Sequence, residues 1–200
     1  MLVPPNPVGA AEWIRGIDFS GARPSIASIQ ADGDKFVVRY LGGRPGYDIT
    51  ASEVSSYLAA GLKVCVVFET LGGRRALSGE ASGAQDARDA SSQAASVGLA
   101  GIPIHFAVDD DLSWADVSPY FDGVLSVLGA ARTGIYGGIR PVRGAADSGI
   151  KYLWQTSSWS SGKWEPRATM RQIAHDVSWA EGPVDIDYAL VADYGQYVGP

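Results

Sequence analysis

Eight short apolar runs, each the length of one β-strand, recur along this 200-residue chain between segments of helical composition. Such alternation is typical of βαβ units around a parallel sheet. The runs are Arg15–Ser20, Phe36–Gly42, Lys63–Thr70, Ile102–Asp111, Gly134–Gly138, Tyr152–Ser157, Thr169–Ala174 and Val184–Tyr188. Because they are apolar on both faces, we expect strands that are covered on both sides of the sheet.

Three intervening segments carry Ala, Leu and polar residues at helical spacing, namely Ile49–Ala60, Ala84–Val97 and Val117–Ala131. Thr50 precedes Glu53 by three residues, the spacing of a capping box at a helix start. Eight strands alternating with helices predict an α/β fold, a single (β/α)8 TIM-like barrel near the lower size limit. The alternative is an open doubly wound sheet, but the chain lacks the GxGxxG and GxxxxGK[ST] phosphate-binding motifs of such folds.

Composition narrows the class of protein further. With 46% hydrophobic and 19% charged residues, the chain can bury one sizeable core, so we expect one domain over residues 1–200, with 1–12 as an N-terminal extension. The net charge of −6 argues against nucleic-acid binding. The single cysteine, Cys65, excludes an intramolecular disulfide. We expect neither a membrane span nor a signal peptide, because no apolar run approaches the necessary ~18 residues and the N-terminus lacks a basic segment.

Acidic residues gather where the predicted strands end. They are Asp18, Glu69, Asp109, Asp110, Asp111, Asp185 and Asp187. Side chains two apart on a strand share a face, so we expect Asp109 and Asp111 to point together, as well as Asp185 and Asp187. Asp110 has the opposite phase and reads as a loop residue or helix N-cap. Because gathering like charges costs stability and raises pKa values, the cluster as a whole predicts a site of acid–base chemistry.

Neutral polar side chains end the other predicted strands: Tyr40, Tyr136, Gln155 and Gln172. His105 lies deeper in its strand and is expected to be a core residue, whereas His175 is expected on the surface or in a loop. Two separated histidines without HExxH spacing predict no zinc site. Cys65 is expected to be a buried, inert thiol.

The strand ends also carry a series of short motifs. In chain order they are Gly16-Ile17-Asp18-Phe19-Ser20, Phe68-Glu69, Gly83-Ala84-Gln85-Asp86-Ala87, Phe106-Ala107-Val108-Asp109-Asp110-Asp111, Leu153-Trp154-Gln155 and Val184-Asp185-Ile186-Asp187. This series, which spans nearly the whole chain, resembles the glycoside-hydrolase-like domain family of actinobacteria and their phages, whose barrel is related to the family 25 lysozymes, which are muramidases. The resemblance implies an acidic groove around the scissile sugar bond, lined by Asp18, Asp109, Asp111 and Asp185.

One departure from the lysozyme pattern concerns the catalytic acid. Where those lysozymes have Asp-x-Glu, this chain has Asp109-Asp110-Asp111. The shorter side chain of Asp111 withdraws the carboxyl by ~1.5 Å, and a misplacement on that scale can cost ~10²-fold in rate. Glu69 could take over the role of the acid, or the domain could bind glycan without cutting it.

The leading hypothesis is therefore a peptidoglycan-directed glycoside hydrolase of the lysozyme type, for example a phage endolysin, without a cofactor. Glycosidic hydrolysis needs one protonated and one ionised carboxyl. We expect Glu69 or Asp111 to be the acid, and Asp109 or Asp18 the ionised partner. The candidate substrate-binding residues are Tyr40, Tyr136, Gln155, Gln172, Asp185, Asp187 and Trp154.

Two other interpretations remain open. The first is a cell-wall glycan-binding module that has kept the barrel and lost activity. The second is a Ca²⁺ or Mg²⁺ site formed by Asp109, Asp111 and Asp185, since these ions prefer oxygen ligands. In the leading hypothesis the partner is peptidoglycan or a related glycan, and the protein acts as a monomer outside the cell or at its wall.

Overall fold

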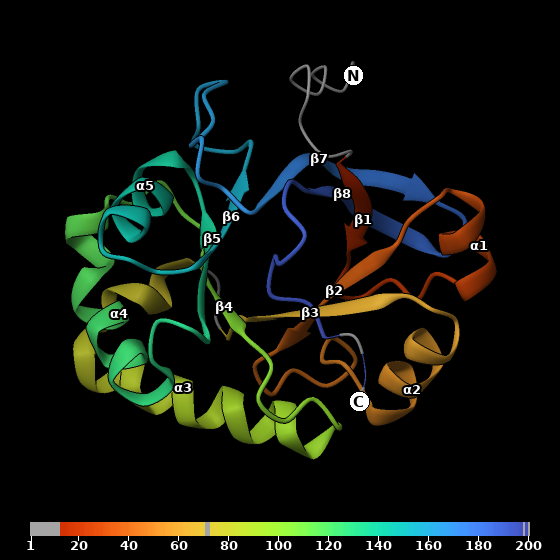
Figure 1. Ribbon diagram of the computed structural model, residues 1–200, viewed down its shortest axis with the longest axis horizontal. Helices are drawn as coiled ribbons and strands as arrows, with labels where there is room; N and C mark the ends of the chain where they lie inside the picture. The colour runs from red at the N-terminus through yellow and green to blue at the C-terminus, as the bar shows by residue number, and fades with distance from the viewer. Residues whose placement is uncertain (1–12, 71–72, 198, 200) are drawn as a thin grey trace.

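The eight strands close into one barrel, in the order in which they occur in the chain (Figure 1). The computed structural model describes residues 13–70, 73–197 and 199, so the predicted extension at 1–12 lies outside the described residues. The strands are β1 (Ile14–Asp18), β2 (Phe36–Leu41), β3 (Lys63–Phe68), β4 (Ile104–Val108), β5 (Thr133–Gly137), β6 (Tyr152–Thr156), β7 (Met170–Trp179) and β8 (Gly182–Ala189). The predicted TIM-like α/β barrel is thus confirmed.

The last strand runs in the direction opposite to the other seven. Neighbours from β1 to β7 pair in parallel, whereas β8 is antiparallel to both β7 and β1. The expectation of a wholly parallel sheet is therefore wrong at β8. A parallel return needs a crossover of a dozen or more residues, but only Ala180 and Glu181 separate β7 from β8, which is the length of a hairpin turn. The reversal brings Asp185 opposite Asp18 in the register.

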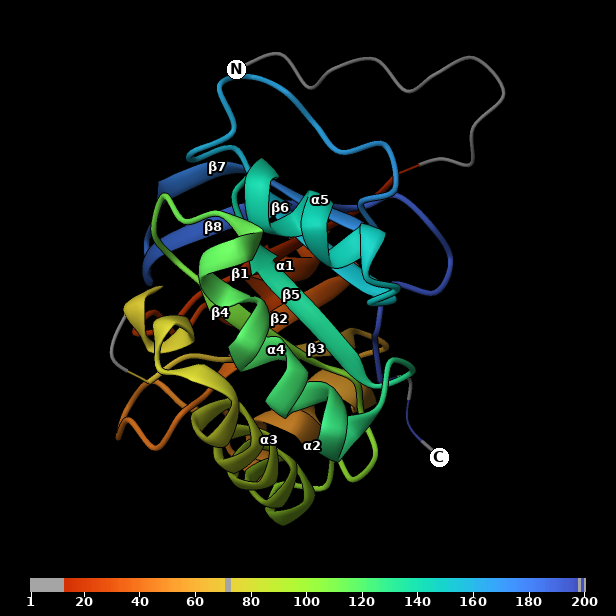
Figure 2. The same cartoon turned by 90° about the vertical axis from the view of Figure 1, so that its left-hand side faces the viewer.

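Helices cover the outside of the barrel between the first six strands (Figures 1 and 2). They are α1 (Ile26–Ala31), α2 (Ala51–Ala59), α3 (Gly79–Ser96), α4 (Trp114–Leu128) and α5 (Ile139–Asp147), with a short 3-10 helix at Gly73–Leu77. The three predicted helices correspond to α2, α3 and α4, and the capping box of Thr50 and Glu53 is present. None of these helices is long and apolar enough to cross a membrane.

The longest two helices, α3 and α4, pack against each other at glycines. A Cβ atom on Gly83 would lie 1.9 Å from the carbonyl oxygen of Tyr120, and one on Gly123 would lie 2.0 Å from that of Glu80. The two backbones can approach this closely only because both positions lack a side chain.

The interior of the barrel is apolar over most of its height and polar at one end. Its apolar residues are Phe36, Val38, Cys65, Val67, Ala107, Tyr136, Trp154, Met170, Ala189 and Tyr194. Cys65 is buried, and burial raises the pKa of its thiol, as expected for an inert cysteine. His105 is a core residue, as predicted, and burial lowers its pKa to about 4. The polar end holds Asp18, Gln172 and Asp187, each at most 1% exposed.

Candidate functional site

Two carboxylates at the polar end of the barrel are joined by one amide. The Nε2 of Gln172 on β7 donates to Asp18 Oδ2 at 2.7 Å and to Asp185 Oδ2 at 2.9 Å. Its Oε1 accepts a hydrogen bond from the Tyr136 hydroxyl at 2.7 Å, which fixes the orientation of the amide. The Tyr40 hydroxyl donates to Asp18 Oδ1 at 3.2 Å. Four of the predicted site residues therefore surround Asp18 in one hydrogen-bonded network.

A third carboxyl lies beneath this network. Asp187 is hydrogen-bonded to Asp18, and its Oδ1 accepts a hydrogen bond from Trp154 Nε1 at 2.8 Å. Two carboxyls can share such a bond only when one carries a proton. Burial, and then the charge of Asp18, raise the pKa of Asp187 well above its usual range. Burial, and then Asp185, raise the pKa of Asp18 to about 7. The pair therefore retains its shared proton to a higher pH than an ordinary carboxylic acid does.

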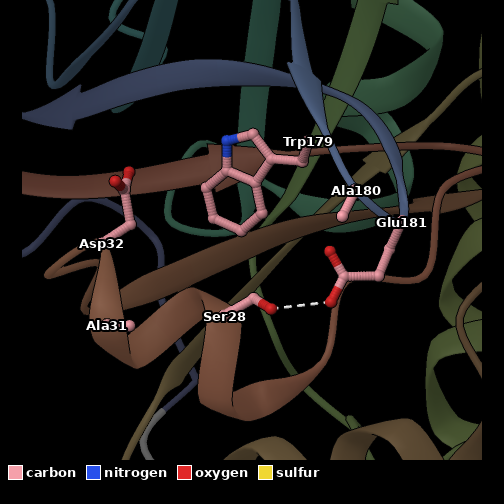
Figure 3. Close-up of a pocket in the computed structure, with 6 residues that line it drawn as sticks. All are labelled: Ser28, Ala31, Asp32, Trp179, Ala180 and Glu181. Carbon is pink, nitrogen blue, oxygen red and sulfur yellow. Dashed lines mark hydrogen bonds between the residues drawn. The ribbon is translucent and has the colours of Figure 1, made fainter.

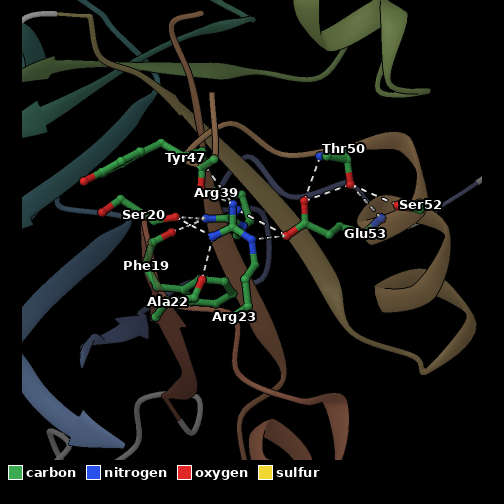
Figure 4. Close-up of polar contacts among 10 residues, drawn as sticks. Phe19, Ser20, Ala22, Arg23, Arg39, Tyr47, Thr50, Ser52 and Glu53 are labelled. Carbon is green, nitrogen blue, oxygen red and sulfur yellow. Dashed lines mark hydrogen bonds and ion pairs between the residues drawn. The ribbon is translucent and has the colours of Figure 1, made fainter. Parts of the chain in front are cut away.

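The loop that follows Asp18 is held by a buried cation (Figure 4). Arg39 on β2 is 0% exposed, and its guanidinium donates to the carbonyl oxygens of Phe19, of Ser20 at 3.3 Å and of Tyr47 at 3.1 Å. Its charge is balanced by Glu53, whose Oε1 lies 3.2 Å away. Glu53 also completes the capping box of α2, so one carboxylate fixes both the helix start and the site loop.

Glu69 and Asp109 lie at the rim, directly after β3 and β4. Glu69 is half-buried, and its pKa is raised by burial and then by the charge of Asp109. Asp109 is exposed to solvent in the groove, yet the surrounding protein desolvates it enough to raise its pKa, while His175 acts in the opposite direction. Asp109 therefore raises the pKa of Glu69 while Arg44 lowers it, and His175 is the group that favours the ionised form of Asp109.

A cavity of about 290 Å³ opens between the carboxylates and the loop after β1. Its lining residues are Asp18, Phe19, Ser20, Gly21, Ala22, Tyr40, Tyr47, Asp176, Pro183 and Asp185. Asp185 is anchored within this wall, because its Oδ1 accepts the Asp176 backbone N–H at 2.7 Å. The cavity thus presents fixed carboxylate acceptors to a polar ligand.

Asp111 turns away from these groups. β4 ends at Val108, so Asp109, Asp110 and Asp111 lie in a turn, and the strand alternation that predicted a shared face for Asp109 and Asp111 does not apply there. Asp111 Oδ1 forms an ion pair with Arg140 Nη2 at 2.7 Å, and its side chain is 59% exposed. Asp110 is a loop residue, as predicted, because its Oδ1 accepts the Asp111 backbone N–H at 2.8 Å.

Gln155 is also occupied elsewhere. It lies on β6 beside Trp154, on the opposite face of the strand, and is fully buried. Its amide donates to Ser160 Oγ at 3.0 Å and to the Lys163 carbonyl at 2.8 Å, and it accepts the Glu165 N–H at 2.7 Å. These bonds make it an anchor of the loop between β6 and β7, separate from the network around Asp18.

Sequence reasoning missed His175 as a member of the site. β7 extends to Trp179, five residues beyond the predicted end, and a bulge between Ala174 and Val177 interrupts its pairing with β8. His175 Nδ1 lies 3.5 Å from Asp185 Oδ2, and that carboxylate raises the pKa of the imidazole. The signal in the sequence was the spacing of nine residues between Ala174 and Val184, which is too short for a crossover and so predicts a hairpin that carries His175 to the rim.

A second depression, of about 320 Å³, lies outside the barrel between α1 and the β7–β8 turn (Figure 3). The indole of Trp179 lies between Asp32 and Glu181, and the Ser28 hydroxyl donates to Glu181 Oε1 at 2.6 Å. It shares no lining residue with the carboxylate cavity. The two are therefore separate surfaces.

A metal site finds no support among the described residues, where no group of three or more His, Cys, Asp or Glu side chains is arranged to hold an ion. The cation site considered from the sequence needed Asp109, Asp111 and Asp185 together. The pairing of Asp111 with Arg140 and of Asp185 with Gln172 gives both carboxylates protein partners instead.

The family model described as "Rv2525c-like, glycoside hydrolase-like domain" matches residues 27–191. A curated relative from Mycobacterium tuberculosis, named "Putative peptidoglycan hydrolase Rv2525c", is 29% identical over 199 residues, which cover 90% of this chain and 82% of the relative.

Several solved structures have a similar fold. The crystal structure of the Mycobacterium tuberculosis Tat-secreted protein Rv2525c in complex with HEPES has a TM-score of 0.84 at 27% identity, over 91% of this chain and 98% of that one. A muramidase from Acremonium alcalophilum has a TM-score of 0.61 at 17% identity, over 90% and 95% of the two chains. A family 25 glycosyl hydrolase from Bacillus anthracis has a TM-score of 0.54 at 15% identity, over 91% and 93%.

Proposed function

Since the chain belongs to the Rv2525c-like, glycoside hydrolase-like domain family, we propose that it hydrolyses a glycosidic bond of peptidoglycan, as a lysozyme-like N-acetylmuramidase does. The family is the one that the sequence motifs resemble, and its barrel is related to that of the family 25 glycosidases. The observation that carries the proposal is the pair of rim carboxyls, Glu69 and Asp109, whose pKa values are both raised.

Glu69 is the general acid in this proposal. Its pKa is raised by burial and by Asp109, so it retains a proton to a higher pH than an ordinary glutamate and can give it to the leaving oxygen. Asp109 is the ionised partner, because His175 favours its charged form. Asp111 is not assigned this role, since it lies at the surface in an ion pair with Arg140.

The floor of the cavity binds the sugar. Asp18 and Asp185 are held in place by Gln172, and their free lone pairs accept hydrogen bonds from sugar hydroxyl groups or from an acetamido N–H. The Tyr40 hydroxyl lies in the same lining. Tyr136, Trp154 and Asp187 act from below by fixing these groups, without touching the substrate.

The experiment is digestion of purified peptidoglycan, with mass spectrometry of the soluble fragments to detect new reducing ends. We expect Glu69→Gln to abolish release and Asp109→Asn to reduce it by on the order of 10²-fold or more. Asp111→Asn tests the other candidate acid, and we expect it to retain most of the activity. Asp122→Asn, which removes an exposed carboxylate of α4, is the matched control.

The pH dependence provides an independent test. The wild-type rate is expected to fall as pH rises through the raised pKa of Glu69, because the acid loses its proton, and to fall again at low pH as Asp109 becomes protonated. If Glu69→Gln released the same fragments at the same rate, Glu69 would not be the acid.

The second candidate is a glycan-binding module on the same barrel. It is favoured by one observation, that the residue at the position of the lysozyme acid, Asp111, is paired with Arg140 instead of facing the cavity. This candidate predicts no fragments from any variant, together with co-sedimentation with insoluble peptidoglycan that Asp18→Asn weakens. In either case we propose that the protein acts outside the cell, since its relative Rv2525c is a Tat-secreted protein.

A further inference from the structure

Three side chains on adjacent strands form a linear array at the rim of the barrel. Ser157 directly follows β6, His175 lies in β7 and Asp185 in β8. The Ser157 Oγ lies 2.9 Å from His175 Nε2, and His175 Nδ1 lies 3.5 Å from Asp185 Oδ2. A hydroxyl, an imidazole and a carboxylate in this order have the connectivity of a Ser-His-Asp triad, which is recognised by geometry and not by position in the chain.

Each end of the array is held by backbone or amide contacts. The Ser157 N–H donates to the Gln172 carbonyl at 2.9 Å, which extends the β6–β7 pairing to the serine. Asp185 accepts hydrogen bonds from Gln172 Nε2 and from the Asp176 N–H. These bonds fix the orientation of its carboxylate independently of the contact with the His175 imidazole. A buried or anchored carboxylate that orients the histidine is the third requirement of a triad.

Ser157 is the closest of three hydroxyls to the imidazole. Ser158 Oγ lies at 3.3 Å and Thr156 Oγ1 at 3.4 Å from the same Nε2. Ser157 is half-buried, and the His175 and Asp185 side chains are 35% and 24% exposed, so a ligand in the groove can reach the array. Trp159 and Asp176, close to the serine and the histidine, have φ values of 53° and 51°, a strained backbone conformation that recurs at functional sites.

We propose that Ser157, His175 and Asp185 form a nucleophilic site that hydrolyses carboxylic esters, with the O-acyl groups of sugars as the substrate class. The carboxylates of the neighbouring cavity favour a neutral, hydroxyl-bearing ligand over an anionic one. This activity goes beyond glycosidic cleavage and does not depend on Glu69 as an acid.

The chemical steps balance with water as the only co-reactant. The Ser157 Oγ attacks the ester carbonyl carbon while His175 Nε2 takes the hydroxyl proton. The tetrahedral intermediate collapses, the C–O bond to the sugar breaks, and the sugar oxygen takes the proton from His175. A water molecule then attacks the acyl carbon and gives a proton to His175. The bond between that carbon and Ser157 Oγ breaks, and Oγ takes the proton from His175 as the carboxylic acid leaves.

The array works only when His175 is neutral. Asp185 on β8, Asp18 on β1 and Asp176 on its own strand stabilise the imidazolium and raise the pKa of His175 above 6.5, and Asp109 after β4 also faces it. On the β6 side, the hydrogen-bond partners of the imidazole among the described residues are the hydroxyl groups of Thr156, Ser157 and Ser158. Ester hydrolysis should therefore increase with pH through a single ionisation above the ordinary histidine range.

The first test is covalent labelling with an alkyl fluorophosphonate, which loses fluoride when an activated serine attacks its phosphorus. At pH 8.5 we expect the intact mass of the wild-type protein to show one adduct, mapped to Ser157 by peptide mass spectrometry. An unlabelled wild-type protein, or an adduct on another residue, would overturn the proposal. This test uses no variant and is independent of peptidoglycan hydrolysis.

Variants locate the function. Ser157→Ala should abolish labelling and the hydrolysis of p-nitrophenyl acetate, and His175→Asn should reduce both by on the order of 10²–10⁴-fold. Ser148→Ala, an exposed serine at the end of α5, is the matched control and should retain both, with circular dichroism confirming that each variant folds. Equal rates in Ser157→Ala and Ser148→Ala, or a wild-type rate that declines between pH 6 and 8.5, would refute the triad.

Discussion

The buried carboxyl of Asp18 makes the stability of the fold depend on pH. Asp18 is 1% exposed, and its pKa is raised from an ordinary 3.8 to about 7, chiefly by burial and then by Asp185. The folded protein therefore keeps a proton on this carboxyl at pH values where the unfolded chain has lost it. Asp18→Asn removes this titrating group and retains a side chain of nearly the same shape.

The sign and the size of the effect follow from proton linkage. Because the folded state binds more protons than the unfolded state between pH 3.8 and about 7, the free energy of unfolding falls as pH rises through that interval. Each pH unit costs 1.36 kcal/mol for one proton, so the whole interval amounts to about 4 kcal/mol. This contribution of Asp18 is fully present below pH 3.8 and is lost above about pH 7.

The assay is urea denaturation of the wild-type and Asp18→Asn proteins at several pH values between 4.5 and 8. We expect the wild-type free energy of unfolding to fall more steeply, by about 1.4 kcal/mol for each pH unit between 4.5 and 6.5. Asp187 remains in both proteins, and because the charge of Asp18 contributes to its raised pKa, the difference between the two curves reports the titration of the coupled pair. The surface variant Asp122→Asn should follow the wild type. Parallel curves for wild type and Asp18→Asn would refute the raised pKa.

Three further predictions concern packing and ion binding. Gly83→Ala should lower the free energy of unfolding by about 1–3 kcal/mol, measured by urea denaturation, because the new Cβ meets the Tyr120 carbonyl at 1.9 Å and the helix-propensity gain of about 1 kcal/mol does not offset that overlap. Arg39→Met should cost about 2–5 kcal/mol in the same assay, since it removes the guanidinium donors to the carbonyl oxygens of Phe19 and Tyr47 and leaves Glu53 with Arg23 as its cationic partner. Excess chelator should leave the melting temperature unchanged, whereas a lower value would restore the calcium or magnesium interpretation.

The barrel was predictable because its strands are strongly marked. Runs such as Lys63–Phe68 are buried on both faces, and a strand of that kind is distinct in the sequence whatever its neighbours are. An apolar run does not indicate in which direction its strand runs in the sheet. The strand–helix alternation of the rest of the chain therefore predicted a parallel β8. The helix α1 was missed because six residues give too few turns for an apolar periodicity to stand out. The helix α5 is as long as α2, but it contains Pro141 and Gly144 and lacks a side-chain cap, so its sequence resembles a loop.

The candidate site was predictable where a residue belongs to a strand and unpredictable where it lies in a turn. Asp18 and Asp185 lie side by side because they are paired in the register of β1 and β8. Their positions near the ends of predicted strands indicated that they would lie in one cluster. Asp111 lies three residues beyond the end of β4, where its direction depends on Arg140 from a distant part of the chain. His175 was missed because its position at the rim results from the bulged extension of β7.

Because β8 runs antiparallel to β1, the start of β1 and the end of β8 lie at the same end of the barrel. Ile14 and Ala189 are paired in the register, as are Asp18 and Asp185 four residues away, or roughly 13 Å at the rise of a strand. The backbone thus enters the first strand and leaves the last one on the face opposite the carboxylate cavity. A linker joined through either of these strand ends would orient the cavity outward, toward an insoluble polymer too large to diffuse to it.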